Sequence, residues 1–486
     1  MLPNPRTLQQ FLLILLIILA VFPLFLHLNT LSLRMWDESR LAINAAEMSV
    51  NGNWLIPHYN GEPEMWSTKP PLMIWLQAGL MELIGINELA VRLPAALAAL
   101  ATVLLVFFFA SKEFQNPFIG FLSGAALVTS FGYVDQHVSR TGDYDALLTL
   151  WVTVYALAYY RYLNTFKLKY LVWFTAALIL AAYTKGVAGF MCLPGLLLYT
   201  IFRRQFVVVI TDKRLYVCIA AVAFTVLAYY LLREHYNPGY LQAVYENELG
   251  GRFLEVTEQH DKPWWFYFKG DRFLPWLALL PLYFILIFRQ QLSPFRQYAI
   301  FTLCFFGSFF VIISAAQTKL PWYMAPVFPV TAVLAGIGLC LLMQWLIIRF
   351  RVQNGFRFSA ILTVVFFAVP YFVVIQKIYA KLNKDPQNTE MQYGYFMDDL
   401  AVQQYTQYTL LRKDEYNAAL EFYVFKYKQQ GAHINAEFAT DVPALQPQQK
   451  VATCDPAIRE NIESNYETEL LEENYGCGFY RIIREK

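Results

Sequence analysis

The sequence predicts a mainly α-helical protein that crosses a membrane many times and carries a small α/β domain at its C-terminal end. Hydrophobic residues make up 57% of the 486 residues and charged residues only 15%, whereas soluble domains are about 25% charged. The hydrophobic residues gather in runs of about 20, the length of a membrane-spanning helix. Because these runs lack the alternation of barrel strands, helices are expected rather than a β-barrel.

About eleven apolar runs, and at most about 13, are long enough to span a membrane. The predicted spans are roughly 9–28, 89–110, 117–134, 144–163, 170–184, 186–202, 215–232, 273–288, 298–315, 321–348 and 358–378. Three prolines fall in the run 321–348, so a kink or a split is expected there. Residues 72–84 are short and interrupted, which favours a helix that lies at the membrane interface.

Basic residues are concentrated in alternate loops. With a cytoplasmic N-terminus, the inner loops contain Arg6, Lys112, Lys167, Lys169, Arg203, Arg204, Lys213, Arg214, Arg289, Arg296, Arg349, Arg351 and Arg357. The only acids in these loops are Glu113 and Asp212, which is a strong positive-inside bias. The polar loops 29–71 and 233–272 are then expected on the outer side of the membrane.

The last part of the chain differs in composition from the rest. Residues 380–486 are polar and mix helical and strand-like patterns, which predicts an outer α/β domain after a membrane domain at 1–379. Cys454 and Cys477 lie in this tail. In an oxidising compartment a disulfide between them would add roughly 3 kcal/mol of stability; two free thiols are the alternative.

An acidic pair, Asp37 and Glu38, closely follows the first apolar run. A carboxylate beside the low-dielectric membrane is costly unless a cation or hydrogen-bond donor meets it, so its pKa is expected to rise. Such a group suits a general base that deprotonates an acceptor. The alternative is a solvated charge at a helix end. The following "SRLAINAAEMSVNG" predicts a helix with a glycine stop, lying flat on the membrane.

Three lysines in or next to the outer loops are candidates for binding an anion. Lys69 precedes two prolines that stiffen its loop, and suits a phosphate leaving group; a lysine snorkelling to lipid headgroups is the alternative. Lys185 lies between two apolar spans, where a lysine needs an anionic partner such as a lipid phosphate. Lys319, with Tyr323 nearby, lies at another outer helix end.

Two further polar clusters fall on the outer side. Asp143 and Asp145 lie at the start of the span predicted at 144–163. They could belong to a site, or they could cap the N-terminus of this helix. In the large loop 233–272, Arg252 and His260 could bind phosphate or a metal, although one histidine without a spaced second ligand is weak evidence for a metal.

Several motifs together carry a family resemblance. They are "WDESR", "AAEM", "GNWLIPHYNGEP", "KPPLMIWL", "NELAVRLPAALAAL", "RTGDYDALLTLW", "TKG", "RF…H…PWWFY" and "KLPWYMAPVFP", in this order over about residues 8–345. The chain resembles the GT-C superfamily of membrane glycosyltransferases. It is most similar to the branch of bacterial aminoarabinose transferases of lipid A, with protein O-mannosyltransferases as more distant relatives.

The resemblance implies roles for individual residues. Asp37 would be the catalytic base, with Asp145 supporting the site, and Lys69 and Arg252 would hold the donor phosphate. The aminoarabinose branch usually has an acid directly before the lysine of "KPP", where this chain has Thr68. A divalent metal held by that acid and the loop histidine is therefore not assured, and Glu64 or Glu62 is the expected substitute. No other cofactor is implied.

The chemistry of the residues agrees with this resemblance. No glycine-rich phosphate loop is present, and the net charge of +2 gives no reason to expect nucleic acid. A polyprenyl-phosphate sugar can reach an outer site from within the membrane, whereas a cytosolic nucleotide sugar cannot. We therefore expect transfer of a sugar from such a donor at the outer face. The resemblance implies a lipid A or lipopolysaccharide acceptor and the periplasmic face of a bacterial inner membrane.

Two alternatives are kept open. A protein O-glycosyltransferase would use the same donor class with a protein acceptor. A lipid-linked sugar flippase belongs to another class. One-sided acids and a folded outer tail argue against the flippase, because transporters more often place their charges near the membrane midplane.

Overall fold

The structure, a computed structural model, describes residues 5–250, 262–268, 276, 279–289, 294–382, 390–413, 416–438 and 444–486. The chain forms two compact units. The first unit comprises Met1–Leu26, Met65–Met73 and Pro94–Ile378, and the second comprises His27–Glu64, Ile74–Leu93 and Tyr379–Lys486. The tail expected after residue 379 thus shares its unit with most of the first outer loop.

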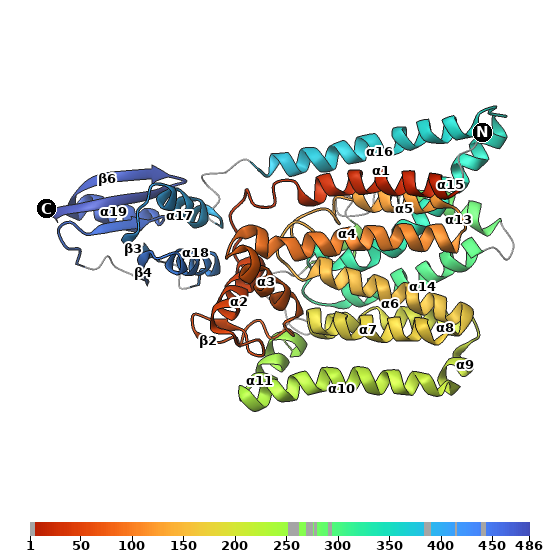
Figure 1. The fold of residues 1–486 in the computed structure, drawn as a ribbon, viewed down its shortest axis with the longest axis horizontal. Coiled ribbons are helices and arrows are strands. Elements are labelled where there is room, and N and C mark those ends of the chain that lie inside the picture. The colour runs from red at the N-terminus through yellow and green to blue at the C-terminus, as the bar shows by residue number, and fades with distance from the viewer. Residues whose placement is uncertain are drawn as a thin grey trace. The chain divides into compact units, whose positions relative to one another are not determined.

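The first unit is a bundle of helices (Figure 1). Its α-helices are α1 (Pro5–Phe25), α4 (Glu88–Glu113, from Pro94 onward), α5 (Pro117–Val128), α6 (Asp145–Thr165), α7 (Leu168–Lys185), α8 (Leu193–Phe202), α9 (Phe206–Thr211), α10 (Lys213–Tyr236), α11 (Tyr240–Val244), α13 (Leu280–Phe288), α14 (Pro294–Ala315), α15 (Phe328–Arg349) and α16 (Gly355–Ala380). Shorter 3-10 or π-helical turns are η1 (Gly186–Phe190), η2 (Tyr245–Gly250), η3 (Phe266–Phe268) and η5 (Pro321–Val327).

Seven helices of the described part of the chain are long and apolar enough to cross a membrane. This finding confirms a polytopic membrane protein, with fewer clear spans than the eleven expected. The runs predicted at 117–134 and 186–202 form helices of only 12 and 10 residues. An apolar run sets the burial of a segment, but does not by itself say where the helix within it ends.

The packing of α15 places it at the centre of the bundle. Its residues Phe328–Met343 are buried throughout, and it packs on α5, where a side chain at Gly336 would collide with Ser123. Small residues let helices approach closely in a membrane. The predicted proline-rich break is confirmed, because η5 precedes α15 and Pro329 occupies the first turn of the new helix.

The second unit contains the elements of the first outer loop. Helix α2 (Asp37–Asn51) ends at Gly52, whose φ of 69° is left-handed and whose N–H donates to Met48. Strands β1 (His58–Tyr59) and β2 (Glu62–Pro63) form a small antiparallel hairpin. Helix α3 (Leu72–Ile84) has the bounds expected of the interfacial helix. The left-handed Gly52 at the end of α2 confirms the glycine stop predicted for this helix.

The tail is the small α/β domain that the sequence predicts. Its elements are α17 (Gln392–Val402), β3 (Gln407–Arg412), α18 (Ala418–Gln429), β4 (His433–Phe438), β5 (Lys450–Thr453), α19 (Pro456–Asn465), β6 (Tyr466–Asn474) and β7 (Cys477–Glu485). The strands form one sheet in the order β4-β3-β5-β7-β6. β3 pairs in parallel with β4 and β5, whereas β7 is antiparallel to β5 and β6.

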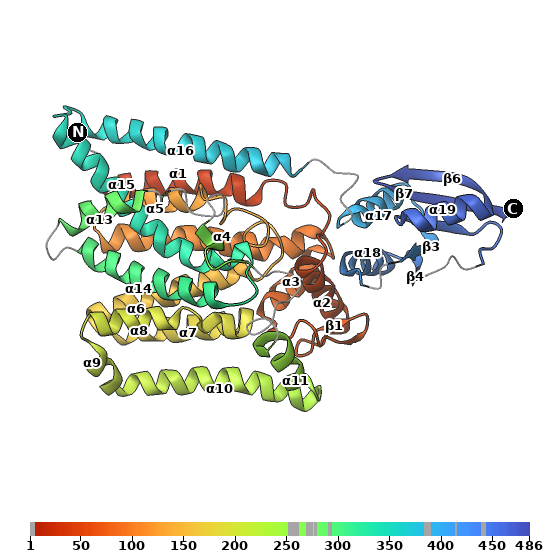
Figure 2. The same ribbon diagram turned by 180° about the vertical axis from the view of Figure 1, so that it is seen from behind.

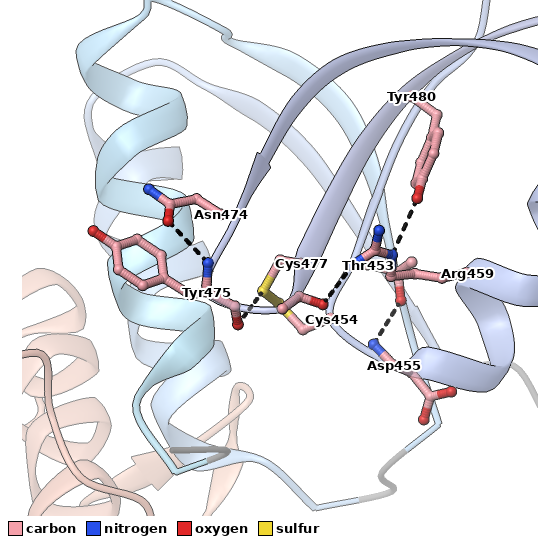
Figure 3. The surroundings of a disulfide bond; sticks show 9 residues. Thr453, Cys454, Asp455, Arg459, Asn474, Tyr475, Cys477 and Tyr480 are labelled. Atoms are coloured by element: carbon pink, nitrogen blue, oxygen red, sulfur yellow. Dashed lines mark hydrogen bonds between the residues drawn. A yellow bond between two sulfur atoms is a disulfide. The ribbon is translucent and has the colours of Figure 1, made fainter. Parts of the chain in front are cut away.

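A disulfide joins Cys454 to Cys477 (Figure 3), as predicted. Cys454 directly follows β5 and Cys477 begins β7, and these two strands are neighbours in the sheet. Close by, Arg459 of α19 donates to the hydroxyl of Tyr480 on β7. The bridge therefore closes α19 and β6 into a loop whose two ends are already paired.

Candidate functional site

A cavity of about 280 Å³ in the first unit collects several of the predicted site residues. Its polar lining comprises Lys69, Asp145, Lys185, Glu248, Thr318 and Tyr323. The rest of the wall is apolar, from α6, α14 and the turn after α7. A polar cluster inside an apolar wall is the usual composition of a ligand site. The structure therefore brings together residues from segments far apart in the sequence.

Lys185 and Asp145 form one ion pair of this cavity. The ammonium nitrogen of Lys185 lies 2.8 Å from both carboxylate oxygens of Asp145, and 5.5 Å from the centre of the Tyr323 ring. Asp145 is the first residue of α6 and Lys185 the last of α7. An acid at a helix N-terminus and a base at a C-terminus each interact favourably with the helix dipole. The helix-end role considered for Asp145 and a role in the site thus coexist.

Lys69 forms the second ion pair of the cavity. Its ammonium nitrogen lies 2.8 Å from Glu248, and the side chain is 7% exposed. Burial and pairing do not fit a lysine that snorkels to lipid headgroups. Glu248 was not predicted as a site residue, because an acid in a long polar loop carries no local signal of its partner.

The loop around Lys69 is held by hydrogen bonds within the first unit. The hydroxyl of Tyr240 donates to the backbone oxygen of Thr68 at 2.6 Å. The side-chain amide of Asn247 donates to the backbone oxygen of Met65 at 2.9 Å. Fixed backbone on both sides of a short segment limits the positions that its lysine can take. The ammonium group of Lys69 is therefore presented to the cavity from a preorganised loop.

Asp143 lies in a different environment from Asp145. Its carboxylate accepts from Thr141 at 2.6 Å and lies 3.1 Å from Nδ1 of His137. The His137 ring stacks on Trp322 with 3.7 Å between ring centres. The other oxygen of Asp143 is buried and finds no hydrogen-bond partner among the described residues. A buried carboxylate oxygen with open capacity is a group that a substrate donor could satisfy.

Lys319 is buried close to the cavity wall. Its ammonium group donates to the backbone oxygen of Ala316 at 2.6 Å, and Ala316 lines the cavity. Arg252 and His260, also expected in the site, lie outside the described residues.

In the second unit, the two acids of the first outer loop have different surroundings. Asp37 is the first residue of α2 and is partly exposed. Glu38 is 1% exposed and accepts from Arg92 at 2.7 and 3.1 Å and from the backbone N–H of Arg34 at 3.0 Å. Both Glu38 oxygens are therefore engaged, whereas the Asp37 side chain is partly exposed.

Arg92 shows why Glu38 is held so firmly. Its guanidinium group also donates to the backbone oxygens of Leu28, Leu31 and Ser32 at 2.6 to 2.9 Å. One buried arginine thus ties the chain before α2 to the start of α4. Arg92 could be recognised in the sequence only as part of a motif, since its five donors identify no partner until the chain is folded.

Glu64 was considered as a metal ligand, and its carboxylate is already engaged. One oxygen accepts from Arg40 at 2.6 Å and from Asn44 at 3.1 Å, and the other from Arg40 at 2.8 Å. The Arg40 guanidinium in turn lies 3.6 Å from the centre of the Tyr59 ring. A metal at Glu64 would have to displace this arginine. Glu62, the other substitute, is exposed on β2.

Comparisons with known proteins show what the chain is similar to in sequence and in fold. Residues 68–237 match the family model described as dolichyl-phosphate-mannose-protein mannosyltransferase. An undecaprenyl phosphate-α-4-amino-4-deoxy-L-arabinose arabinosyl transferase of Proteus mirabilis is 29% identical over 66% of this chain and 59% of its own length. A relative of the same name from Pseudomonas fluorescens is 30% identical over 66% of this chain and 55% of its own length. The chain therefore spans less than two thirds of the length of these curated relatives.

Solved structures show the same fold. ArnT from Cupriavidus metallidurans, crystallised with undecaprenyl phosphate, matches with a TM-score of 0.72 and 17% identity over 96% of this chain and 97% of that one. An Archaeoglobus fulgidus oligosaccharyltransferase matches with a TM-score of 0.54 and 12% identity over 88% of this chain and 64% of that one. The resemblance predicted from the sequence is thus confirmed as a likeness in sequence and in fold, and the chain has the polytopic helical fold of ArnT.

Proposed function

We propose that the protein is an integral-membrane glycosyltransferase of the bacterial inner membrane. It would transfer a sugar from a polyprenyl-phosphate donor to a lipid A or lipopolysaccharide acceptor at the periplasmic face. The observation that carries this proposal is the cavity lined by two lysines, the buried Lys69 and the partly buried Lys185, each paired with a carboxylate. The names of the curated relatives, which specify an undecaprenyl-phosphate donor, support the donor class.

The two lysines suit a departing phosphate. Each ammonium group has three donors, and each pairs with a carboxylate in a mostly apolar site, Lys69 with Glu248 and Lys185 with Asp145. A phosphate that enters the cavity would accept hydrogen bonds from the ammonium N–H groups that do not already donate to these carboxylates. Charge-assisted hydrogen bonds to a phosphate strengthen as negative charge develops on it. The lysines would therefore stabilise the transition state more than the bound donor.

The proposed reaction needs one proton acceptor. The acceptor oxygen forms a bond to the anomeric carbon of the sugar while the bond from that carbon to the phosphate oxygen breaks. The bonding electrons stay on the phosphate, and the acceptor proton goes to a carboxylate. Asp37 is the proposed base because it is partly exposed, whereas both oxygens of its neighbour Glu38 are engaged. Glu38 is then proposed to position the start of α2.

The proposed reaction does not depend on a divalent metal held by Glu64. A divalent ion would neutralise phosphate charge if it were bound, and oxygen ligands would suit it. The engagement of Glu64 with Arg40 disfavours that ligand. We therefore propose that lysine side chains, rather than a metal at Glu64, carry the charge of the leaving phosphate.

The test is a transfer assay with the full-length protein purified in detergent. Undecaprenyl-phosphate aminoarabinose and lipid A are supplied, and labelled lipid A is the expected product. Transfer needs no sealed membrane, whereas flipping does. Movement of the donor across sealed vesicles without any transfer in detergent would contradict the proposal and favour a flippase.

A protein O-glycosyltransferase is the second candidate, favoured by the family model that matches residues 68–237. Mass spectrometry of lipid A and of periplasmic glycoproteins, from cells with and without the gene, separates the two acceptors. A sugar that disappears from lipid A alone supports the lipid acceptor. A sugar that disappears from glycoproteins alone assigns the protein acceptor.

A further inference from the structure

A second, larger groove of the first unit lies away from the lysine cavity. It has a volume of about 900 Å³ and is lined by side chains of α1, α5, α15 and α16. Both views show α16 running beside α1 at the edge of the bundle (Figures 1 and 2). The walls are apolar along most of the groove, with Leu12 and Leu15 on one side and Val364 on the other. A space of this size inside a membrane is filled by hydrocarbon, because an apolar wall gives water no partners.

Helix α16 is one of the two least buried of the long apolar helices in the described part of the chain, together with α10. Only 11% of its apolar window is buried within the protein. One of its firm contacts is an aromatic pair, with 4.5 Å between the ring centres of Phe367 and Trp276. The indole of Trp276 also donates to Thr129 of α5 at 3.3 Å. Phe367 and Thr129 both line the groove, so Trp276 links helix α16 to the C-terminal end of α5 at this end of it.

The other end of the groove lies where α15 ends and α16 begins, and three arginines belong to this stretch of the chain. Leu8, Ile347 and Phe356 line the groove there, and Arg357 directly follows Phe356 while Arg349 lies two residues after Ile347. Arg349, Arg351 and Arg357 are exposed. The acid nearest to this end in the sequence, Glu113, is paired with Arg161. The mouth of the groove is therefore positively charged, on the side predicted to be cytoplasmic.

We propose that the groove binds an acyl chain of an anionic glycerophospholipid from the cytoplasmic leaflet. The headgroup phosphate would lie on Arg349, Arg351 and Arg357, and the chain would fill the space between α16 and the bundle. Basic pockets between helices on the cytoplasmic side are suited to anionic headgroups. The donor of the proposed reaction would instead present its phosphate at the outer face, which Trp276 separates from this mouth. The proposal rests on the membrane orientation of the proposed function, but on none of its catalytic residues.

The expected size of the effect follows from the charges. Each basic residue near an anionic surface contributes about 1 kcal/mol, or roughly fivefold in affinity. Loss of all three arginines should therefore weaken binding of the anionic lipid by roughly 100-fold. Binding of a zwitterionic lipid with the same chains should be much weaker from the start, and should change little.

The test uses the full-length protein, delipidated in detergent, with phosphatidylglycerol and phosphatidylcholine of identical acyl chains as probes. Native mass spectrometry counts bound lipids, and thermal unfolding reports the stabilisation that binding produces. We expect a tight phosphatidylglycerol adduct with a raised unfolding temperature, and neither with phosphatidylcholine. Equal binding of the two lipids would overturn the proposal.

Two variants test the two halves of the site. Arg349→Gln/Arg351→Gln/Arg357→Gln should lose the preference for phosphatidylglycerol. Its matched control, Arg204→Gln/Lys213→Gln/Arg289→Gln, removes exposed basic residues that lie far in the sequence from the residues lining the groove and should keep the preference.

Ala360→Trp places a large side chain in the groove, because Ala360 lines it from the exposed helix α16. It should lose the adduct with all arginines in place. Unchanged lipid binding in Ala360→Trp would show that the chain lies elsewhere. Tighter binding of undecaprenyl phosphate than of phosphatidylglycerol, lost in the same variant, would assign the groove to the donor and overturn the proposal. Loss of transfer activity without loss of lipid binding concerns the catalytic proposal alone.

Discussion

Removal of Arg92 should unfold the second unit at a much lower denaturant concentration or temperature. Arg92 neutralises Glu38, which is 1% exposed, and donates to three backbone oxygens. The change Arg92→Ala leaves a buried carboxylate without its cation and these oxygens without their donor. Breaking a buried ion pair in this way costs roughly 3–5 kcal/mol. The expected loss of stability is therefore a large part of what a domain of this size possesses.

The assay is denaturant or thermal unfolding of the purified protein, followed by a probe in the second unit such as the fluorescence of Trp54. Asp37→Asn is the matched control, since it changes the neighbouring, partly exposed acid. It should shift stability by no more than about 0.5 kcal/mol. Equal destabilisation by the two variants, or none by Arg92→Ala, would refute the assignment of Glu38 to structure and Asp37 to chemistry.

Three further outcomes are expected. Asp37→Asn should lower the rate of transfer by on the order of 10²–10⁴ while folding persists, and near-normal turnover would remove Asp37 from the mechanism. Residue 480 should map outside the cytoplasm in a reporter-fusion experiment, and Cys454 and Cys477 should react with thiol reagents only after reduction; a cytoplasmic tail would overturn the orientation. Burial raises the pKa of Glu47 above its ordinary value of 4.5, although the N–H groups of Asn60 and Gly61 oppose this shift. Because the pKa of Glu47 is raised in the folded state, the contribution of Glu47 to stability is lost as the pH rises through that pKa. The stability of the second unit in Glu47→Gln should therefore change less with pH around that pKa than in the wild type. An unchanged pH profile would contradict this assignment.

Local signals predicted much of the fold. The glycine after α2, the bounds of α3 and the proline-rich break before α15 were each read from a few neighbouring residues. The α/β tail and its disulfide followed from a change in composition and from two cysteines. These features could be predicted because backbone preferences and amphipathic patterns act within a short stretch of chain.

The pairings of the candidate site could not be predicted, because they arise only when distant segments meet. Lys69 and Lys185 were expected to bind an anion, but the sequence did not reveal Glu248 or Asp145 as their partners. Asp143 and Asp145 lie in one turn, and the fold nevertheless sends one to His137 and the other to Lys185. A sequence shows which residues carry charge, whereas burial and neighbours decide what the charge does.

The most direct test of the central claim is steady-state kinetics of Lys69→Ala with donor and acceptor varied separately. Lys169→Ala is the matched control, because Lys169 is exposed near the start of α7 and does not line the cavity. If Lys69 holds the donor phosphate, kcat/KM for the donor should fall roughly 10- to 100-fold, as expected for a lost hydrogen bond to a charged group. The KM for the acceptor should stay close to that of the wild type and of Lys169→Ala. Equal losses for donor and acceptor, or no loss for either, would contradict a phosphate-binding cavity at Lys69.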